Sequence, residues 1–124
     1  MSKVMVVGAS RGIGLELTKQ YAEAGDHVIA CARDISEAQK LDSLAEGSAN
    51  IVIKELDIGN PKSIESAKSE IGDGIVDTLI IVAGTTGGQH QSLDDLDFEE
   101  WHNALNINTI GPVLVARAFK ANLV

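Results

Sequence analysis

The feature that most constrains the fold is a glycine-rich loop between two segments of different periodicity. The loop reads Gly8-Ala9-Ser10-Arg11-Gly12-Ile13-Gly14. Residues 4–7 before it are all apolar, which is typical of a strand buried on both faces. After it, apolar side chains recur at steps of four and three, at Ile13, Leu17, Tyr21 and Ala24. This spacing predicts a helix with one apolar face that ends near Gly25.

The rest of the chain repeats the alternation of strand and helix. Strands are predicted at residues 27–31, 51–56 and 78–82. Ser36 is the expected N-cap of a second helix, Asn60 with Pro61 opens a third, and Asp97 with Glu100 resembles a capping box that opens the last one. Because the connections are short, we expect an α/β fold with a parallel sheet and right-handed crossovers. Residues 1–124 form a single predicted domain.

Composition excludes several classes of protein. Apolar residues make up 44% of the 124 residues and charged residues 23%, which rules out a disordered tail, and no apolar run is long enough for a membrane span. The net charge of −8 argues against binding to nucleic acid or to anionic lipid. Cys31 is the single cysteine and is expected to be a small buried hydrophobe, so no internal disulfide forms. The three histidines share no ligand spacing with carboxylates, and no metal site is predicted. Without a signal peptide, a cytoplasmic location is expected.

The glycine loop has the composition and context of a phosphate-binding turn. Gly8 permits a tight turn, Gly12 lets the backbone approach a pyrophosphate, and Gly14 allows the helix to pack closely on the strand. The helix N-terminus would then present its unpaired N–H groups to the phosphates. The alternative is a tight strand-to-helix turn without a ligand.

The spacing of the three glycines closely resembles the short-chain dehydrogenase/reductase family. Leu56-Asp57-Ile58, Ala83-Gly84 and Asn108-Thr109-Ile110-Gly111 resemble further motifs of that family in the same order. The resemblance covers the whole chain but only the cofactor-binding half of a family member. It implies a Rossmann-type doubly wound parallel sheet with strand order 3-2-1-4, apparently truncated. The positions to which it gives a cofactor-binding role are Gly8, Ser10, Arg11, Gly12, Ile13, Gly14, Arg33, Asp57, Ile58, Ala83 and Gly84.

The sequence departs from the family pattern at two places. Ile81-Val82 stands where the family has paired asparagines, and nothing matches its catalytic Tyr-x-x-x-Lys or the partner serine. The only tyrosine, Tyr21, is followed four residues later by Gly25 and is interpreted as a packing residue. The family reaction is hydride transfer between NADPH and a small carbonyl or alcohol substrate. For this chain, a non-catalytic nucleotide-binding or regulatory module and a folding fragment both stay open, and the sequence does not name a substrate.

The end of the second strand bears on the choice of cofactor. An acidic residue there would accept hydrogen bonds from an adenosine ribose, whereas this chain has Ala32 followed by Arg33. With Arg11 in the glycine loop, the resemblance implies NADP(H) in preference to NAD(H). The alternative is that Arg33 is solvated, or pairs with Asp34 or Glu37. Asp57 would bind the adenine amino group if the family role applies, or would be a turn aspartate.

Asn108 is the candidate catalytic residue. It lies on a helical face with an otherwise mostly apolar character, formed by Trp101, Leu105, Pro112, Val115 and Phe119, and that face is expected to be buried. Pro112 lacks the N–H that would bond the Asn108 carbonyl, which predicts a kink and a free carbonyl. In the family this asparagine holds a water of the proton relay. The alternative is a core asparagine bonded to neighbouring backbone.

Two features predict a homo-oligomer. The fourth strand has no fifth strand beside it in this sequence, so its outer edge would be open. A second apolar stripe, Ile107, Ile110, Leu114 and Ala118, runs along the last helix. In the family this helix packs against its symmetry mate, and an exposed stripe would favour a twofold partner.

Overall fold

A four-stranded parallel sheet forms the centre of the molecule. The structure is a computed structural model that describes residues 1–123. Its strands are β1 (Lys3–Val7), β2 (His27–Ala32), β3 (Ile51–Glu55) and β4 (Thr78–Ile81), all parallel and in the order β3-β2-β1-β4. The predicted fold class and strand order are therefore confirmed.

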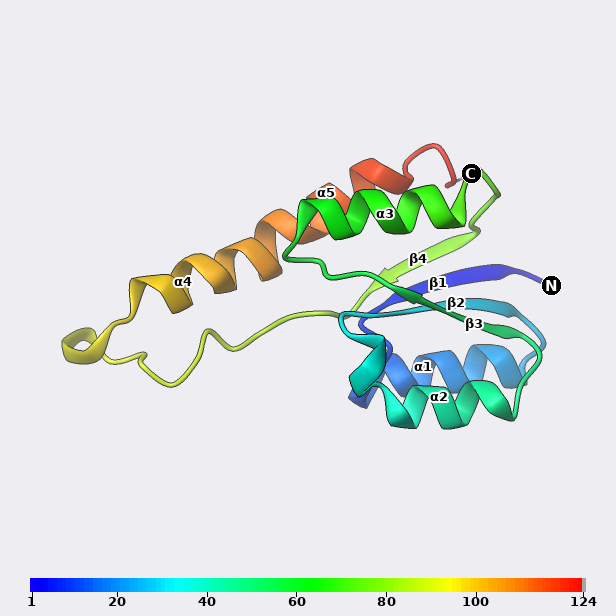
Figure 1. Cartoon of the computed structure of the whole chain (residues 1–124), viewed down its shortest axis with the longest axis horizontal. Helices are drawn as coiled ribbons and strands as arrows, with labels where there is room; N and C mark the ends of the chain where they lie inside the picture. The colour runs from blue at the N-terminus through cyan, green and yellow to red at the C-terminus, as the bar shows by residue number, and fades with distance from the viewer. Residues whose placement is uncertain (124) are drawn as a thin grey trace.

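Helices cover both faces of this sheet. In Figure 1, α1 (Gly12–Glu23) and α2 (Gln39–Glu46) lie on one face, and α3 (Pro61–Ile71) and α5 (Gly111–Phe119) lie on the other. The remaining helix, α4 (Phe98–Leu105), extends away from the sheet and joins α5 through a π-helical segment, η3 (Asn106–Ile110). Two short 3-10 turns, η1 (Ile35–Glu37) and η2 (Leu93–Asp95), complete the described elements.

The strong apolar run of β1 supplies both layers of the core. Val4 and Val6 pack in the cluster under α1 and α2, whereas Met5 and Val7 pack in the cluster under α3 and α5. All four are at most 1% exposed, because alternate residues of a strand point to opposite faces and both faces are covered. The continuous apolar run thus has the structural consequence that the sequence predicted.

The buried face of α1 differs from the predicted one. Ile13 is 71% exposed, and the fully buried positions are Gly14, Thr18 and Ala22. At Gly14 no side chain fits, because a Cβ there would collide with the Gly8 carbonyl group at the start of the glycine loop. Thr18 is buried without a penalty since its hydroxyl donates to the Gly14 carbonyl oxygen at 2.8 Å. Tyr21 packs against the core cluster under α1, as predicted.

The predicted N-cap of the second helix is also wrong. Ser36 lies inside η1, where Asp34 is the capping residue, and α2 begins only at Gln39 with no side-chain cap. The Ser36 hydroxyl donates to the Asp34 carboxylate instead of accepting from a helix amide. A serine hydroxyl can do either, and the local 3-10 turn favours the shorter-range bond.

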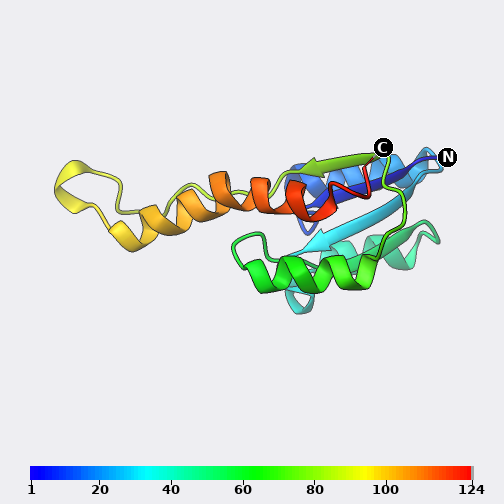
Figure 2. The ribbon, with the colours of Figure 1, turned by 90° about the horizontal axis from the view of Figure 1, so that it is seen from above.

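The helical rod from α4 to α5 is interrupted where Pro112 was expected to disturb it. Within η3, the N–H of Gly111 bonds the Asn106 carbonyl oxygen five residues earlier, so the regular α-helical pairing is lost just before the proline. The burial prediction for this rod is only half right: Val115 and Phe119 are buried, but Trp101 and Leu105 are 48% and 55% exposed. Figures 1 and 2 show the reason, since α4 projects beyond the sheet.

The second apolar stripe of this rod is mostly used inside the molecule. Ile107, Leu114 and Ala118 pack partly buried against the core cluster under α3 and α5, and only Ile110 is 51% exposed. The prediction of an exposed stripe along these four residues is therefore wrong. The exposed apolar surface instead includes Trp101, Leu105 and Val113.

Self-association stays a prediction, with a revised test. On its outer side β4 has no strand partner among residues 1–123, which leaves an open edge. We expect light scattering at micromolar concentration to give at least twice 13.1 kDa. Val113→Asp changes a side chain that is 65% exposed and should lower that mass. Val52→Asp on β3, at the other edge of the sheet, is the matched control, and a monomeric wild type contradicts the prediction.

Candidate functional site

A cleft of about 630 Å³ lies at the carboxyl ends of the central strands. Parallel α/β sheets bind ligands at this edge. The structure brings ten of the eleven predicted cofactor-binding residues together there, and only the buried Gly14 does not line the cleft. The ten are Gly8, Ser10, Arg11, Gly12, Ile13, Arg33, Asp57, Ile58, Ala83 and Gly84.

The glycine loop is shaped by close backbone contacts. Gly8 has φ +97°, and a Cβ placed on it would lie 2.6 Å from the Ala83 backbone nitrogen. A Cβ on Gly14 would collide with the Gly8 carbonyl group. The N–H groups of Gly8 and Ala9 both donate to the Cys31 carbonyl oxygen, at 3.0 and 2.9 Å. The loop therefore packs tightly between the ends of β2 and β4.

The N-terminus of α1 is left open toward the cleft. Arg11 is the N-cap residue in an extended conformation, without a side-chain cap bond, and the first turn holds no acidic residue. Gly12 has φ +56° and open space where a side chain would be. By contrast, Asn60 caps α3 and Asp97 caps α4 through their side chains. Since Gly12 and Ile13 line the cleft, the first-turn amides of α1 are suited to an anionic ligand.

Two arginines frame this region. Arg11 and Arg33 are exposed and line the cleft. Among residues 1–123, Arg33 forms no ion pair with Asp34 or Glu37. The Asp34 carboxylate accepts hydrogen bonds from Ser36, and these bonds, helped by the nearby Arg33 charge, hold the pKa of Asp34 below its ordinary value. The guanidinium of Arg33 is therefore available to a ligand.

Asp57 has the structural role of a turn aspartate within the cleft wall. Its Oδ1 accepts from the Gly59 N–H at 3.0 Å, and its own N–H donates to the Ser63 hydroxyl at 2.8 Å. Of the two interpretations open at the sequence level, the turn contact is present in the structure. The residue also lines the cleft, so the adenine contact stays a prediction.

Asn108 connects the last helical rod to the segment after β4. Its Oδ1 accepts from the Thr85 N–H at 2.8 Å and its Nδ2 donates to the Thr85 carbonyl oxygen at 2.7 Å. The side chain is thus bonded to neighbouring backbone, as one alternative held, although it lies exposed and not in the core. Gly84 lies so close that a Cβ there would be 3.2 Å from the Asn108 Oδ1.

Gly111 explains the second half of the Asn-x-x-Gly pattern. A Cβ on this buried glycine would lie 2.6 Å from the Ile58 Cγ1 and 2.7 Å from the Ile58 carbonyl oxygen. One turn of helix therefore holds the segment after β4 through Asn108 and approaches the β3–α3 connection through Gly111. The two contacts position both sides of the cleft.

Several cleft residues were missed by sequence reasoning. They are Asp34, Glu37, Leu56, Val82, Thr85, Asn103 and Ile107. Val82 ends the strand predicted at residues 78–82, and Thr85 follows three residues later. Because ligands bind at the carboxyl ends of parallel strands, both residues could have been predicted to line the cleft. Asn103 and Ile107 come from the helical rod, and no local pattern signals that they reach the cleft.

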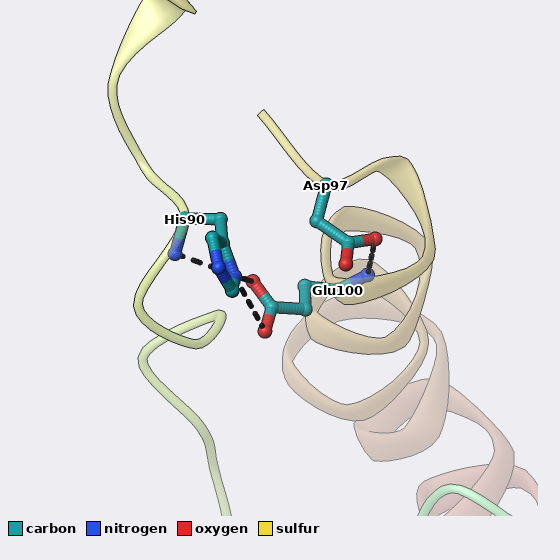
Figure 3. Close-up of side chains that lie close together, drawn as sticks. All are labelled: His90, Asp97 and Glu100. Carbon is teal, nitrogen blue, oxygen red and sulfur yellow. Dashed lines mark hydrogen bonds and ion pairs between the residues drawn. The ribbon is translucent and has the colours of Figure 1, made fainter. Parts of the chain in front are cut away.

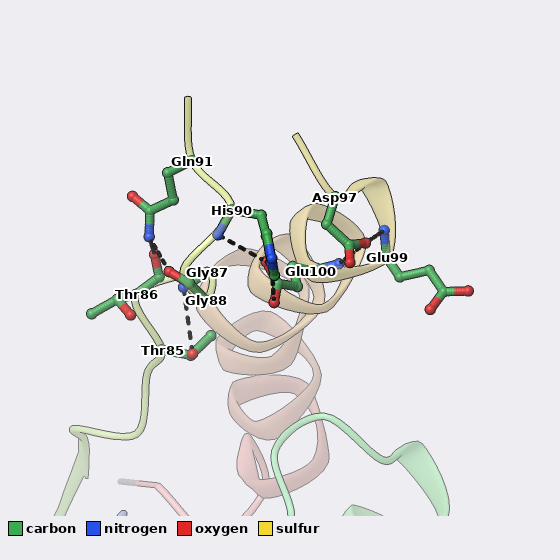
Figure 4. Close-up of polar contacts among 9 residues, drawn as sticks. All are labelled: Thr85, Thr86, Gly87, Gly88, His90, Gln91, Asp97, Glu99 and Glu100. Carbon is green, nitrogen blue, oxygen red and sulfur yellow. Dashed lines mark hydrogen bonds and ion pairs between the residues drawn. The ribbon is translucent and has the colours of Figure 1, made fainter. Parts of the chain in front are cut away.

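A second polar cluster lies outside the cleft. His90, Asp97 and Glu100 place ligand-type atoms within 4.8 Å of one another, although their spacing in the sequence gave no such signal (Figure 3). The His90 Nδ1 lies 3.3 Å from both Glu100 carboxylate oxygens, and the Asp97 Oδ1 accepts from the first-turn amides of α4. Figure 4 shows that these contacts connect the segment after β4 to α4. The cluster therefore has a structural explanation, since it holds the segment after β4 against α4.

Cys31 is expected to be chemically inert in the folded protein. It is fully buried, and burial raises the pKa of its thiol to about 12. Because the thiolate is the reactive form, a thiol-specific reagent at mildly alkaline pH should label Cys31 only after denaturant is added. Fast labelling of the native chain would contradict the buried position.

Comparisons with known proteins agree with the geometry of the cleft. The sequence model of the short chain dehydrogenase family matches residues 2–124. Short chain dehydrogenase tazN of Aspergillus terreus is 34% identical over 94% of this chain and 26% of its own length. The NADPH-dependent pterin aldehyde reductase of Arabidopsis thaliana is 28% identical, over 94% of this chain and 48% of that protein.

A solved structure has the same overall fold. A carbonyl reductase from Pseudomonas aeruginosa PAO1, in complex with NADP, superposes with a TM-score of 0.91 at 32% identity, over 99% of this chain and 56% of that chain. The chain thus spans about half the length or less of the relatives it matches. Among the residues described, no helix is long and apolar enough to cross a bilayer. With a family match from one end of the sequence to the other and the open glycine loop in place, the chain belongs to the short chain dehydrogenase family.

Proposed function

We propose that the chain is the cofactor-binding part of an NADP(H)-dependent oxidoreductase, which transfers hydride between NADPH and a carbonyl or alcohol substrate. In this proposal residues 1–124 are a single NAD(P)-binding Rossmann domain, and the family's catalytic Tyr-x-x-x-Lys and partner serine have no match among them. NADPH would supply the hydride. Substrate, cytoplasmic location and homo-oligomeric state belong to the same proposal and rest on the family and the sequence.

The observation that carries the proposal is the uncapped N-terminus of α1 beside two arginines that form no ion pair within residues 1–123 and line the same cleft. The first-turn amides would hold the pyrophosphate, since no side chain of the helix competes for them. Arg33, free of an ion pair within the described residues, would bind the 2′-phosphate together with Arg11. The adenine would lie toward Asp57 and Ile58, which form the wall of the cleft on the β3 side.

The role of Asn108 is proposed in two parts. Its side chain, bonded at both ends to Thr85, positions the segment after β4 along the cleft. Its backbone carbonyl, which Pro112 cannot bond, would hold the relay water that the family places at this asparagine.

A non-catalytic nucleotide-binding module is the second candidate. One observation favours it: the sequence contains a single tyrosine, Tyr21, and this residue packs from α1 against the core cluster and does not line the cleft. Both candidates bind the same cofactor, so a binding measurement tests what they share. Because neither candidate predicts turnover by these 124 residues alone, only observed turnover would discriminate, and it would exclude the non-catalytic module.

Cofactor preference is the direct test of the shared part. Two charge-assisted contacts at about 1.5–3 kcal/mol each would favour NADPH over NADH by tenfold or more. Arg33→Ala should remove most of this preference and leave NADH affinity nearly unchanged, as measured by calorimetric titration of both cofactors. Arg117→Ala, on α5 outside the cleft, is the matched control. Equal affinities of the wild type for the two cofactors would contradict the proposal.

A further inference from the structure

The segment that follows β2 brings three charged side chains to the cleft. Arg33, Asp34 and Glu37 all line it, within five residues of one another. Asp34 and Glu37 are the two acidic side chains of this segment that could pair with Arg33. In the structure, however, Asp34 does not pair with Arg33 among the described residues.

Ser36 is the residue that binds Asp34 instead. The Asp34 Oδ1 accepts from the Ser36 N–H at 3.0 Å and from the Ser36 hydroxyl at 2.6 Å. These two bonds are the largest causes of the lowered pKa of Asp34, ahead of the charge of Arg33. The Asp34 carboxylate is thus bonded to Ser36 in η1, the turn that directly follows Asp34.

We propose that Ser36 is a positioning residue for cofactor choice: by binding the Asp34 carboxylate it keeps the Arg33 guanidinium free for the 2′-phosphate of NADP(H). This inference rests on the proposed function. According to this inference, the preference for NADP(H) over NAD(H) depends on the Ser36 hydroxyl, although that hydroxyl would not contact the cofactor.

The physical reason is a competition for one carboxylate. Without the Ser36 hydroxyl, Asp34 keeps only the backbone bond and gains freedom to turn toward Arg33. There it would compete with a 2′-phosphate for the guanidinium, and it would repel that phosphate. A free carboxylate in this region can also accept from an adenosine 2′-hydroxyl, which favours NAD(H). Both effects shift the preference away from NADP(H) and toward NAD(H).

The test measures binding of cofactor fragments, so it needs no turnover. The 124-residue chain is titrated in a calorimeter with adenosine 2′,5′-bisphosphate and with 5′-AMP, which differ by the 2′-phosphate. Ser36→Ala should weaken the bisphosphate by about two- to fivefold, the range of an exposed ion pair, without weakening 5′-AMP. Ser36→Thr, which keeps the hydroxyl, should bind like the wild type. Ser43→Ala, an exposed serine of α2 outside the cleft, is the matched control.

A second variant separates positioning from a general change in the loop. In the Ser36→Ala background, Asp34→Asn removes the competing charge and should restore the affinity for the bisphosphate. If Ser36→Ala binds both fragments like the wild type, or if Asp34→Asn restores nothing, the inference is overturned while the NADP(H) proposal stands. If the wild type does not prefer the bisphosphate to 5′-AMP, the proposed function fails, and this inference fails with it.

Discussion

The 124-residue chain is expected to bind NADPH but to reduce ketones and aldehydes at no useful rate. Proton transfer from a positioned acid contributes about 100- to 10,000-fold to such reactions. Tyr21 is the only tyrosine, and it packs in the core cluster under α1. No Tyr-x-x-x-Lys is present to supply the proton.

The measurement is the loss of NADPH absorbance with a panel of ketones and aldehydes. Cofactor binding, titrated in the same preparation, is the control that separates an inactive folded chain from an unfolded one. Turnover in the usual enzyme range of about 1–1,000 per second would show that a group of this chain acts as the acid. It would also decide against the non-catalytic module.

Gly8→Ala is expected to destabilise the fold by more than the strain of a positive φ alone, because the added methyl group also meets the backbone of Ala83. Gly8 and Gly25 have nearly the same φ, +97° and +94°, but different surroundings. A Cβ on Gly8 would lie 2.6 Å from the Ala83 nitrogen and 2.9 Å from the Ala83 Cα, whereas a Cβ on Gly25 meets nothing within 4 Å. Gly25→Ala therefore measures the cost of positive φ alone.

We expect Gly25→Ala to lower the free energy of unfolding by about 1–2 kcal/mol. Gly8→Ala should lower it by about 1–3 kcal/mol more, because the backbone of Ala83 must move. Urea unfolding of the two variants and the wild type gives both values. Equal destabilisation by the two substitutions would contradict this prediction. It would mean that the backbone of Ala83 can move away from the added methyl group without a measurable loss of stability.

The errors of sequence reasoning at Ile13 and Ser36 have different physical causes. At Ile13 the apolar period was real, but the buried face of α1 is formed by Gly14, Thr18 and Ala22, and at Gly14 a Cβ would collide with the Gly8 carbonyl group. The larger Ile13 is displaced toward the cleft. The Ser36 hydroxyl could either accept from a helix amide as an N-cap or donate to the Asp34 carboxylate, and the sequence spacing does not say which bond forms.

The exposure of α4 has a third cause. Its apolar side chains have helical spacing, and spacing predicts burial only where another element covers the face. Because α4 extends away from the sheet, no strand among residues 1–123 covers this face, and Trp101 and Leu105 stay 48% and 55% exposed. The same helix carries Glu100, whose contact with His90 depends on the path of the segment after β4 and not on any sequence interval.

The sequence by itself determined the order of strands and helices, the parallel sheet and the position of the glycine loop at its carboxyl edge. Apolar runs, helical periods and caps such as Asn60 and Asp97 act over a few residues, and local terms of this kind can be recognised along the chain. Only the tertiary structure decided that Asn108 bonds the backbone of Thr85 and that Gly111 approaches Ile58. These two contacts join segments up to 53 residues apart, and they depend on how closely neighbouring elements approach in space, which local spacing does not encode. The bond between Ser36 and Asp34 is different, because it is a choice between local partners that only the three-dimensional structure reveals.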